Sequence, residues 1–461
     1  MPTARKPEPG AAQHPGIGEK TGYALGDLGL NFYWANISAF LLIFYTDTMG
    51  LPAAAVGTMI LLTKVGDAIA DPLMGMLADR TRTRWGRFRP WLLWGALPMA
   101  ATGVLAYTVP ALDTGGRLLW AYATFSLMML AYTVVSIPYS ALSGVITGDS
   151  QQRTTLISLR FIAAFAGTTL VNYATLDLVR WLGAGDDAQG WQRTMMVYGV
   201  VAMALFAGVF ACSRERVAPA AGQRTPLRQD VTDLLHNRPW LVLFVLALVI
   251  MVTIVMRGGA GVYYFKYYLA RPELTGWFLG SYSVALALGA ALTPLLTRWF
   301  DKRRLMLGLM ALVGVLSCAM YLVPADAVGA AFALNILVGL ALGPKSPLAF
   351  SMYADTADYT EWRTGRRATA LTFAAATFSQ KLGGALASAV IAWMLAAMGY
   401  VANQAQSDAS QHGIVLLMTV IPGIVALLAA WTMRFYPLDD ARLAQIQQEL
   451  AARKQTAPEP T

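Results

Sequence analysis

A lysine and two aspartates share one face of a strongly apolar segment near the start of the chain. Lys64, Asp67 and Asp71 stand at positions i, i+3 and i+7, which fall on one side of a helix. Inserting one charged residue at the centre of a bilayer costs about 2.5–3.5 kcal/mol, whereas inserting a leucine is favourable by only about 0.5 kcal/mol. Such a face must look into a polar interior, and two carboxylates one turn apart favour a site for sodium or a proton. The alternative is an ion-pair network that only joins helices.

A second lysine has the neighbours expected at a close contact between helices. Lys381 stands beside Gly383 and Gly384, and such small residues let another helix approach. A lysine in lipid needs an acidic partner, and Asp67 or Asp71 are the best candidates in the apolar segments. We expect this pair to join two distant parts of the chain and to break when a cation or a substrate binds. Lys381 and Lys64 are therefore candidate coupling residues.

A third lysine lies between two prolines. Pro344 and Pro347 flank Lys345 and predict a kinked or broken helix there, because proline removes backbone donors. Broken helices near the midplane commonly line substrate sites. The alternative is that Lys345 reaches toward Asp355 or Asp358 at the end of the same segment.

Other polar residues in the apolar segments are candidates for binding a sugar. Asp27 and Asn31 are one helical turn apart, and Tyr132 has a ring on which a sugar can stack, although such a tyrosine is more often plain packing. Arg160 and Arg257 lie deep in apolar segments, where a charge marks a functional site by default. Lys266, by contrast, lies near the end of its segment, where snorkelling to the interface explains it.

The elements that position these residues are membrane-spanning helices. Hydrophobic residues make up 56% and charged residues 13% of the 461 positions, whereas a soluble domain carries about a quarter charged residues. Apolar blocks recur almost end to end, each with the roughly 20 residues needed to cross a bilayer. We predict twelve spans: 22–46, 56–77, 91–109, 118–146, 154–178, 194–212, 240–264, 276–297, 305–323, 328–353, 368–398 and 413–433.

The spans form two groups of six with a polar stretch between them. We predict a disordered cytoplasmic tail over 1–20, a first half over 21–212, a cytoplasmic linker over 213–239, a second half over 240–433 and a cytoplasmic tail over 434–461 with a short amphipathic helix. Most of the 35 lysines and arginines then lie on the cytoplasmic side, as the positive-inside rule requires. The net charge of +9 is therefore a topology signal and a contact for membrane lipid, and no nucleic-acid partner is expected.

Metal and catalytic centres are not indicated. The chain has two cysteines and three histidines without metal-ligand spacing, and both Cys212 and Cys318 fall inside apolar blocks. No nucleophile–base set is visible, so we expect no enzyme activity and no cofactor. If sodium is the coupling ion, Asp67 and Asp71 are its ligands.

Several motifs resemble one family of membrane carriers. The chain resembles the glycoside–pentoside–hexuronide:cation symporters of the major facilitator superfamily, which include the melibiose carrier, over about residues 20–440. The motifs that carry the resemblance are Gly66–Gly75, Thr83–Trp91, Ser136–Tyr139, Tyr263–Phe265, Ala354–Tyr359 and Lys381–Gly384.

The resemblance implies an all-α membrane protein with the major facilitator fold and both termini cytoplasmic, in the bacterial inner membrane. It implies that Asp67 and Asp71 bind the coupling cation, that Thr133 completes the site, and that Lys381 is linked to it. It also implies that Arg160 lies near the sugar.

The chain departs from the melibiose carrier where that carrier anchors its sugar. Two sugar-binding aspartates of the carrier are replaced by Asn31 and Ser136, which can still bond hydroxyl groups. Galactoside specificity is therefore not expected. With Arg160, Arg257 and Lys345 near the pathway, an anionic sugar and a neutral pentoside or oligosaccharide remain equally open.

These observations predict a monomeric secondary transporter that couples sodium or proton entry to uptake of a glycoside, pentoside or hexuronide by alternating access. The alternatives are a carrier of lysolipids or other amphiphiles on the same scaffold, and a membrane sensor that binds but does not transport.

Overall fold

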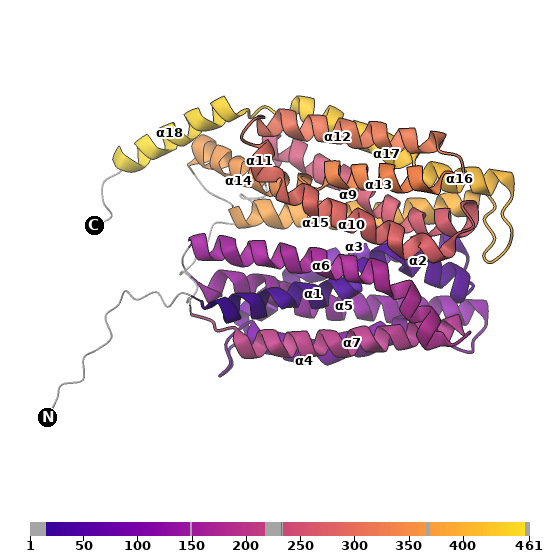
Figure 1. Cartoon of the computed structure of the whole chain (residues 1–461). Helices are drawn as coiled ribbons and strands as arrows, with labels where there is room; N and C mark the ends of the chain where they lie inside the picture. Colours follow the sequence, from indigo (N-terminus) through magenta and orange to yellow (C-terminus); the bar gives the residue numbers. More distant parts are fainter. Residues whose placement is uncertain (1–14, 148–149, 217–231, 233, 366–368, 457–461) are drawn as a thin grey trace.

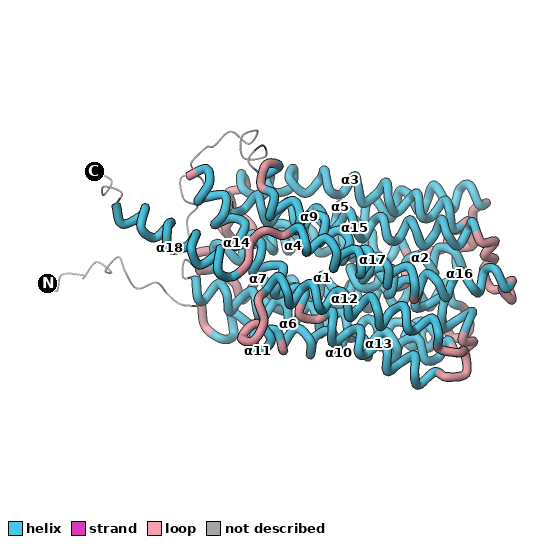
Figure 2. Tube along the Cα trace, turned by 90° about the horizontal axis from the view of Figure 1, so that it is seen from above, coloured by secondary structure: helices cyan, strands magenta, loops and turns pink. Residues whose placement is uncertain are grey.

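The protein is a bundle of long helices. The computed structural model describes residues 15–147, 150–216, 232, 234–365 and 369–456. Within these ranges the chain forms no strand, and its one isolated bridge joins Thr83 and Gly86. Figures 1 and 2 show the helices running side by side along one axis. The all-α prediction is confirmed. The disordered tail predicted over 1–20 is wrong for residues 17–20, because α1 begins at Ile17. The tail before residue 15, most of the linker and residues 457–461 lie outside the described residues.

Each of the twelve predicted spans coincides with a helix or a bent pair of helices. The first half contains α1 (Ile17–Ala39), α2 (Leu41–Ile43), η1 (Phe44–Thr48), α3 (Ala53–Arg80), α4 (Arg89–Ala106), α5 (Thr114–Ile146), α6 (Ser150–Gly183) and α7 (Asp187–Cys212). The second half contains α9 (Arg238–Tyr263), η2 (Tyr264–Tyr268), η3 (Pro272–Leu274), α10 (Thr275–Ala291), α11 (Thr293–Leu296), α12 (Lys302–Ala319), η4 (Met320–Leu322), α13 (Val328–Leu342), α14 (Lys345–Thr364), α15 (Thr369–Ala397), α16 (Asp408–Met418), α17 (Val420–Thr432) and η5 (Met433–Phe435).

Ten helices of the described chain are long and apolar enough to cross a membrane, or eleven when α1 and the segment bent by 57° after it count as one span. The remaining predicted span, 91–109, is occupied by α4, which has 18 residues. The first span of each half also ends in a π-helical turn, η1 after α1 and η2 after α9. Because π-helices are rare, their occurrence at equivalent places supports a duplicated six-helix unit.

Two seams join the halves. At the first, α3 packs on α15, and a methyl group on Gly57 would lie 2.6 Å from Cβ of Ala392. At the second, α6 packs on α10, and a methyl group on Gly280 would lie 2.3 Å from the ring of Tyr173. Glycine is required at both places because no side chain fits between the helices. Asp67 and Asp71 of α3 and Lys381 of α15 lie at the first seam.

The two ends of the bundle differ. We call the end that carries the loop 81–88 and α18 (Asp440–Thr456) the basic end, and the end that carries α2 and α16 the far end (Figure 1). At the basic end the carboxylate of Glu215 accepts hydrogen bonds of 2.8–3.1 Å from the backbone N–H groups of Arg87, Phe88 and Arg89, where α4 begins. Glu215 thus fixes the start of the linker to the first half.

The predicted amphipathic helix after the last span is present as α18. Asp439 accepts a hydrogen bond from the backbone N–H of Arg442 and so caps the start of this helix. The apolar stripe of Leu443, Ile446 and Leu450 is buried. Helix α18 packs on the end of α14, where the indole of Trp362 donates to Glu449 at 2.5 Å.

Candidate coupling and substrate site

A lysine from the second half holds two carboxylates of the first half. The Nζ atom of Lys381 lies 3.0 Å from Oδ2 of Asp67 and 2.5 Å from Oδ2 of Asp71. Helix α3 supplies both acids from one face and α15 supplies the lysine across the first seam. The predicted pairing between distant parts of the chain is therefore present, and it joins the two halves.

A threonine from α5 completes this cluster. Thr133 donates its hydroxyl to Oδ1 of Asp67 at 2.5 Å and lies 3.2 Å from Oδ1 of Asp71. Carboxylate and hydroxyl oxygens are ligands that suit hard cations. The structure thus gathers Asp67, Asp71 and Thr133 as predicted, with Lys381 as the positive charge on these oxygens. Within the described residues no group of three or more His, Cys, Asp and Glu side chains could hold a metal ion.

Lys64 is buried beside the cluster but does not join the ion pairs. Its side chain is 4% exposed, and its Nζ lies 5.3 Å from the centre of the Trp34 ring. Among the described residues no hydrogen-bond acceptor reaches this Nζ. Two lysines and two aspartates together leave the cluster neutral. Lys64 therefore balances charge here, and its predicted coupling role remains a prediction.

A cavity of about 260 Å³ lies between the halves, near the lower end of the roughly 300–1,000 Å³ of ligand pockets. Its polar lining from the first half is neutral and includes Asn31, Trp34 and Thr168. Lys345 and Ser346 line it from α14 of the second half. The rest of the wall is largely apolar and includes Ala35, Ala39, Phe161, Phe165, Met251, Ile254, Val255, Leu279 and Leu286.

Lys345 reaches this cavity because the span breaks beside it. Helix α13 ends at Leu342 and α14 begins at Lys345, so the break predicted from the prolines is confirmed. The alternative has Lys345 reaching toward Asp355 or Asp358. Among the described residues Lys345 forms an ion pair with neither carboxylate, and Asp355 is instead paired with Lys302 at 2.8 Å.

An ion pair within the first half lies next to the cavity. The carboxylate of Asp27 accepts from Nε of Arg160 at 2.5 Å and from the hydroxyl of Tyr139 at 3.0 Å. Asn31 donates to the backbone carbonyl of Asp27 at 2.8 Å and accepts from Thr168 at 3.0 Å. Asp27 and Arg160 do not line the cavity themselves. Asn31 connects the Asp27–Arg160 pair to the cavity, because it contacts Asp27 and also lines the cavity.

Three other predicted sugar residues do not line the cavity. Tyr132 packs on Trp34 with ring centres 6.4 Å apart, and neither Tyr132 nor Ser136 lines the cavity. Arg257 is 2% exposed, and its guanidinium donates to Ser317 at 3.1 Å and to Asn335 at 2.7 Å. The expectation that Arg257 faces the pathway is therefore corrected, because neutral acceptors of neighbouring helices hold it inside the second half.

Sequence reasoning missed several polar residues of the cavity, and three of them have oxygens that are unpaired within the described part of the chain. Ser38, Asn172 and Tyr282 line it, and each carries a buried oxygen without a hydrogen-bond partner among the described residues. A single hydroxyl or amide in an apolar span carries no signal that separates it from ordinary packing. Only the arrangement of the helices identifies these three oxygens as candidate ligands for sugar hydroxyl groups.

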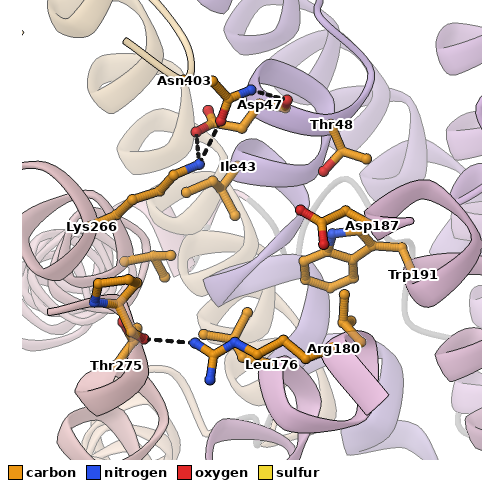
Figure 3. A pocket seen from close by; sticks show the side chains of 13 residues that line it. Ile43, Asp47, Thr48, Leu176, Arg180, Asp187, Trp191, Lys266, Thr275 and Asn403 are labelled. Carbon is orange, nitrogen blue, oxygen red and sulfur yellow. Dashed lines mark hydrogen bonds and ion pairs between the residues drawn. The ribbon is translucent and has the colours of Figure 1, made fainter. Parts of the chain in front are cut away.

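A polar cluster closes the space between the halves at the far end. Lys266 lies 2.6 Å from the carboxylate of Asp47 (Figure 3). The same carboxylate also accepts hydrogen bonds from Tyr267 and Tyr400. Asn403 accepts from Lys266 at 2.8 Å and donates to the backbone carbonyl of Asp47. Snorkelling was expected for Lys266, but the structure gives it a buried carboxylate from the other half.

Comparison with known proteins agrees with this geometry. The profile of the MFS/sugar transport protein family matches residues 22–440. The chain is 40% identical over 440 residues to the inner membrane symporter YicJ of Escherichia coli (strain K12), covering 95% of each chain. It is 36% identical over 433 residues to the putative glycoside/cation symporter YagG of the same organism, covering 94% of each chain.

The fold also agrees with solved transporter structures. The nucleoside transporter NupG superposes with a TM-score of 0.66 at 12% identity, over 91% of this chain and all of that one. The chain therefore belongs to the MFS/sugar transport protein family of glycoside–pentoside–hexuronide:cation symporters and is a multi-pass protein of the inner membrane.

Proposed function

We propose that this protein carries a glycoside across the inner membrane together with sodium or a proton and releases it chemically unchanged. The observation that carries this proposal is that Lys381 of one half occupies the oxygen cluster of Asp67, Asp71 and Thr133 in the other. A relative that covers nearly the whole chain bears the name of a putative glycoside/cation symporter, which supports the same activity.

The coupling step is a competition for two carboxylates. A sodium ion that binds the oxygens of Asp67, Asp71 and Thr133, or a proton on one carboxylate, weakens the attraction of the pair for Lys381. Lys381 then leaves or loosens its contact across the first seam. Because a ligand shifts an equilibrium only through its different affinities for the two states, this loss of an inter-half ion pair is the differential contact that coupling requires.

The substrate acts at the cavity between the halves. Asn31 and Thr168 bind hydroxyl groups from the first half, and Trp34 offers a ring on which a sugar stacks. A substrate held from both sides draws the halves together and permits the rocking motion of alternating access. In our proposal the basic end faces the cytoplasm, and the far end opens to admit substrate when the Asp47 cluster breaks.

Uptake into proteoliposomes tests the proposal. Radiolabelled pentosides, hexosides and uronides are offered with an imposed sodium gradient, an imposed proton gradient or neither. We expect accumulation of at least one sugar only with one of the gradients, and a matching flux of that cation when sugar is added. Uptake that is indifferent to both gradients, and that moves neither cation, overturns the coupling.

The same preparation separates the alternative functions. Inhibition of uptake by lysolipids but by no sugar would identify an amphiphile carrier. Saturable sugar binding without any flux would identify a sensor.

A further inference from the structure

The positive charges around the central cavity differ in whether a carboxylate is paired with them. Asp27 is paired with Arg160, and the two carboxylates of α3 are held by Lys381. Lys64 stands one turn from Asp67 and balances that cluster. Once these groups are assigned, Lys345 is the one cation among the described residues that lines the cavity without an assigned counter-charge.

Lys345 has no anionic or neutral acceptor among the described residues. It is half-buried, and its side chain makes no hydrogen bond or ion pair with them. The nearest acid that the sequence offered, Asp355, is bound to Lys302 at 2.8 Å. An ammonium group in a cavity with largely apolar walls is costly unless something pairs with it.

The other polar groups of the cavity are neutral and come mostly from the opposite side. Asn31, Ser38, Thr168 and Asn172 belong to α1 and α6, whereas Lys345 belongs to α14. A ligand that spans the cavity therefore meets amide and hydroxyl groups at one side and an ammonium group at the other. Such an arrangement matches a sugar whose hydroxyls face the first half and whose negative charge faces the second.

We propose that Lys345 binds an anionic substituent of the substrate and makes this cavity selective for acidic glycosides, such as those with a carboxylate, over neutral ones of the same stereochemistry. This inference rests on the proposed function, because it takes the central cavity to be the substrate site. Arg257 is also a cation of the second half, but it does not line the cavity. Its guanidinium is held by Ser317 and Asn335 and lies 5.9 Å from the ring centre of Tyr282, so the wall separates it from a ligand in the cavity.

Equilibrium binding tests the inference without requiring transport. Purified full-length protein is titrated with pairs of 4-nitrophenyl glycosides that differ only at C6, an alcohol in one member and a carboxylate in the other, in the gluco and galacto series. We expect the acidic member of at least one pair to bind about tenfold more tightly or better, as for a charge paired in a desolvated site.

Variants locate the selectivity. In Lys345→Gln the ratio of affinities within the pair should fall to near unity while the neutral member keeps its affinity, and in Lys345→Arg the ratio should largely return. Arg257→Gln is the matched control, a cation removed from the same half but outside the cavity, and it should leave the ratio unchanged. The inference is overturned if Lys345→Gln weakens binding of the acidic and the neutral glycoside equally. It is also overturned if Lys345→Gln leaves the ratio of their affinities unchanged.

Two further outcomes separate this inference from the proposed function. Selective binding of acidic members by a wild-type protein that shows no cation-driven flux would sink the symport proposal and leave Lys345 as the anion-binding residue. Cation-driven flux of neutral glycosides, with no acidic member bound in any pair, would support the symport proposal and overturn the anion-binding role of Lys345.

Discussion

Lys266 and Asp47 lie 2.6 Å apart, and each stands in the π-helical turn that ends the first span of its half. The duplicated architecture thus brings equivalent turns face to face at the far end. Asp47 is almost fully buried, and Tyr267, Tyr400 and Thr46 also donate hydrogen bonds to it. A carboxylate with this many donors is a strong contact between the halves, because bonds to a charged acceptor are roughly twice as strong as neutral ones.

We predict that Asp47→Asn loosens the far end. The neutral amide loses the ion pair with Lys266, so the state in which the far end is open should gain population. A cysteine placed at Ile43, which lines the pocket of Figure 3, should react faster with a membrane-impermeant thiol reagent in this variant. Asp187→Asn, at the same pocket but without the ion pair, is the control. Unchanged labelling in Asp47→Asn would show that the cluster does not hold the far end closed.

We predict that Asp71→Asn uncouples transport. The amide no longer attracts a cation as a carboxylate does, and it releases Lys381 in part, since Asp67 remains 3.0 Å from the ammonium group. Accumulation driven by a cation gradient should fall about tenfold or more, whereas exchange of labelled for unlabelled sugar at equilibrium should persist. Retention of full gradient-driven accumulation would remove Asp71 from the coupling site.

We predict that Glu215→Gln lowers the thermal stability of the first half. In the carboxylate, Oε1 accepts from all three consecutive N–H groups at the start of α4, and Oε2 accepts from Arg87 as well. Glutamine replaces one of these oxygens by an NH2 group that cannot accept, and it removes the negative charge from the helix start. The loss should be about 1–2 kcal/mol, the range for a helix cap. Thermal unfolding of the purified protein measures it, with Asp186→Asn, a cap of α7 at the far end, as a comparison for an exposed site.

We predict that Gly383→Ala impairs folding. A methyl group at Gly383 would lie 2.4 Å from the backbone carbonyl oxygen of Leu248, and backbone cannot move aside as a side chain can. Gly308→Ala is the matched control, because a methyl group at that helical glycine meets nothing within 4 Å and alanine favours helix. We expect a lower melting temperature for Gly383→Ala and an equal or higher one for Gly308→Ala. Equal melting temperatures would contradict the close approach of α9 and α15.

The helices and the ion pair across the first seam could be predicted from the sequence. Apolar blocks of membrane length have no alternative to helix, since every backbone group must find a partner inside the segment. Lys381, Asp67 and Asp71 could be matched because an unpaired charge in lipid is so costly that few partners satisfy it. The break before Lys345 followed from Pro344 by the same local chemistry.

Only the tertiary structure decided which polar side chains meet in the cavity. Arg160 and Arg257 are both deep cations, yet one pairs with Asp27 beside the cavity and the other is enclosed by Ser317 and Asn335. The uncharged oxygens of the cavity wall could not be recognised from the sequence either. A charge can be recognised in an apolar sequence because lipid cannot solvate it. The direction in which its side chain points depends on packing against helices that are distant in the sequence.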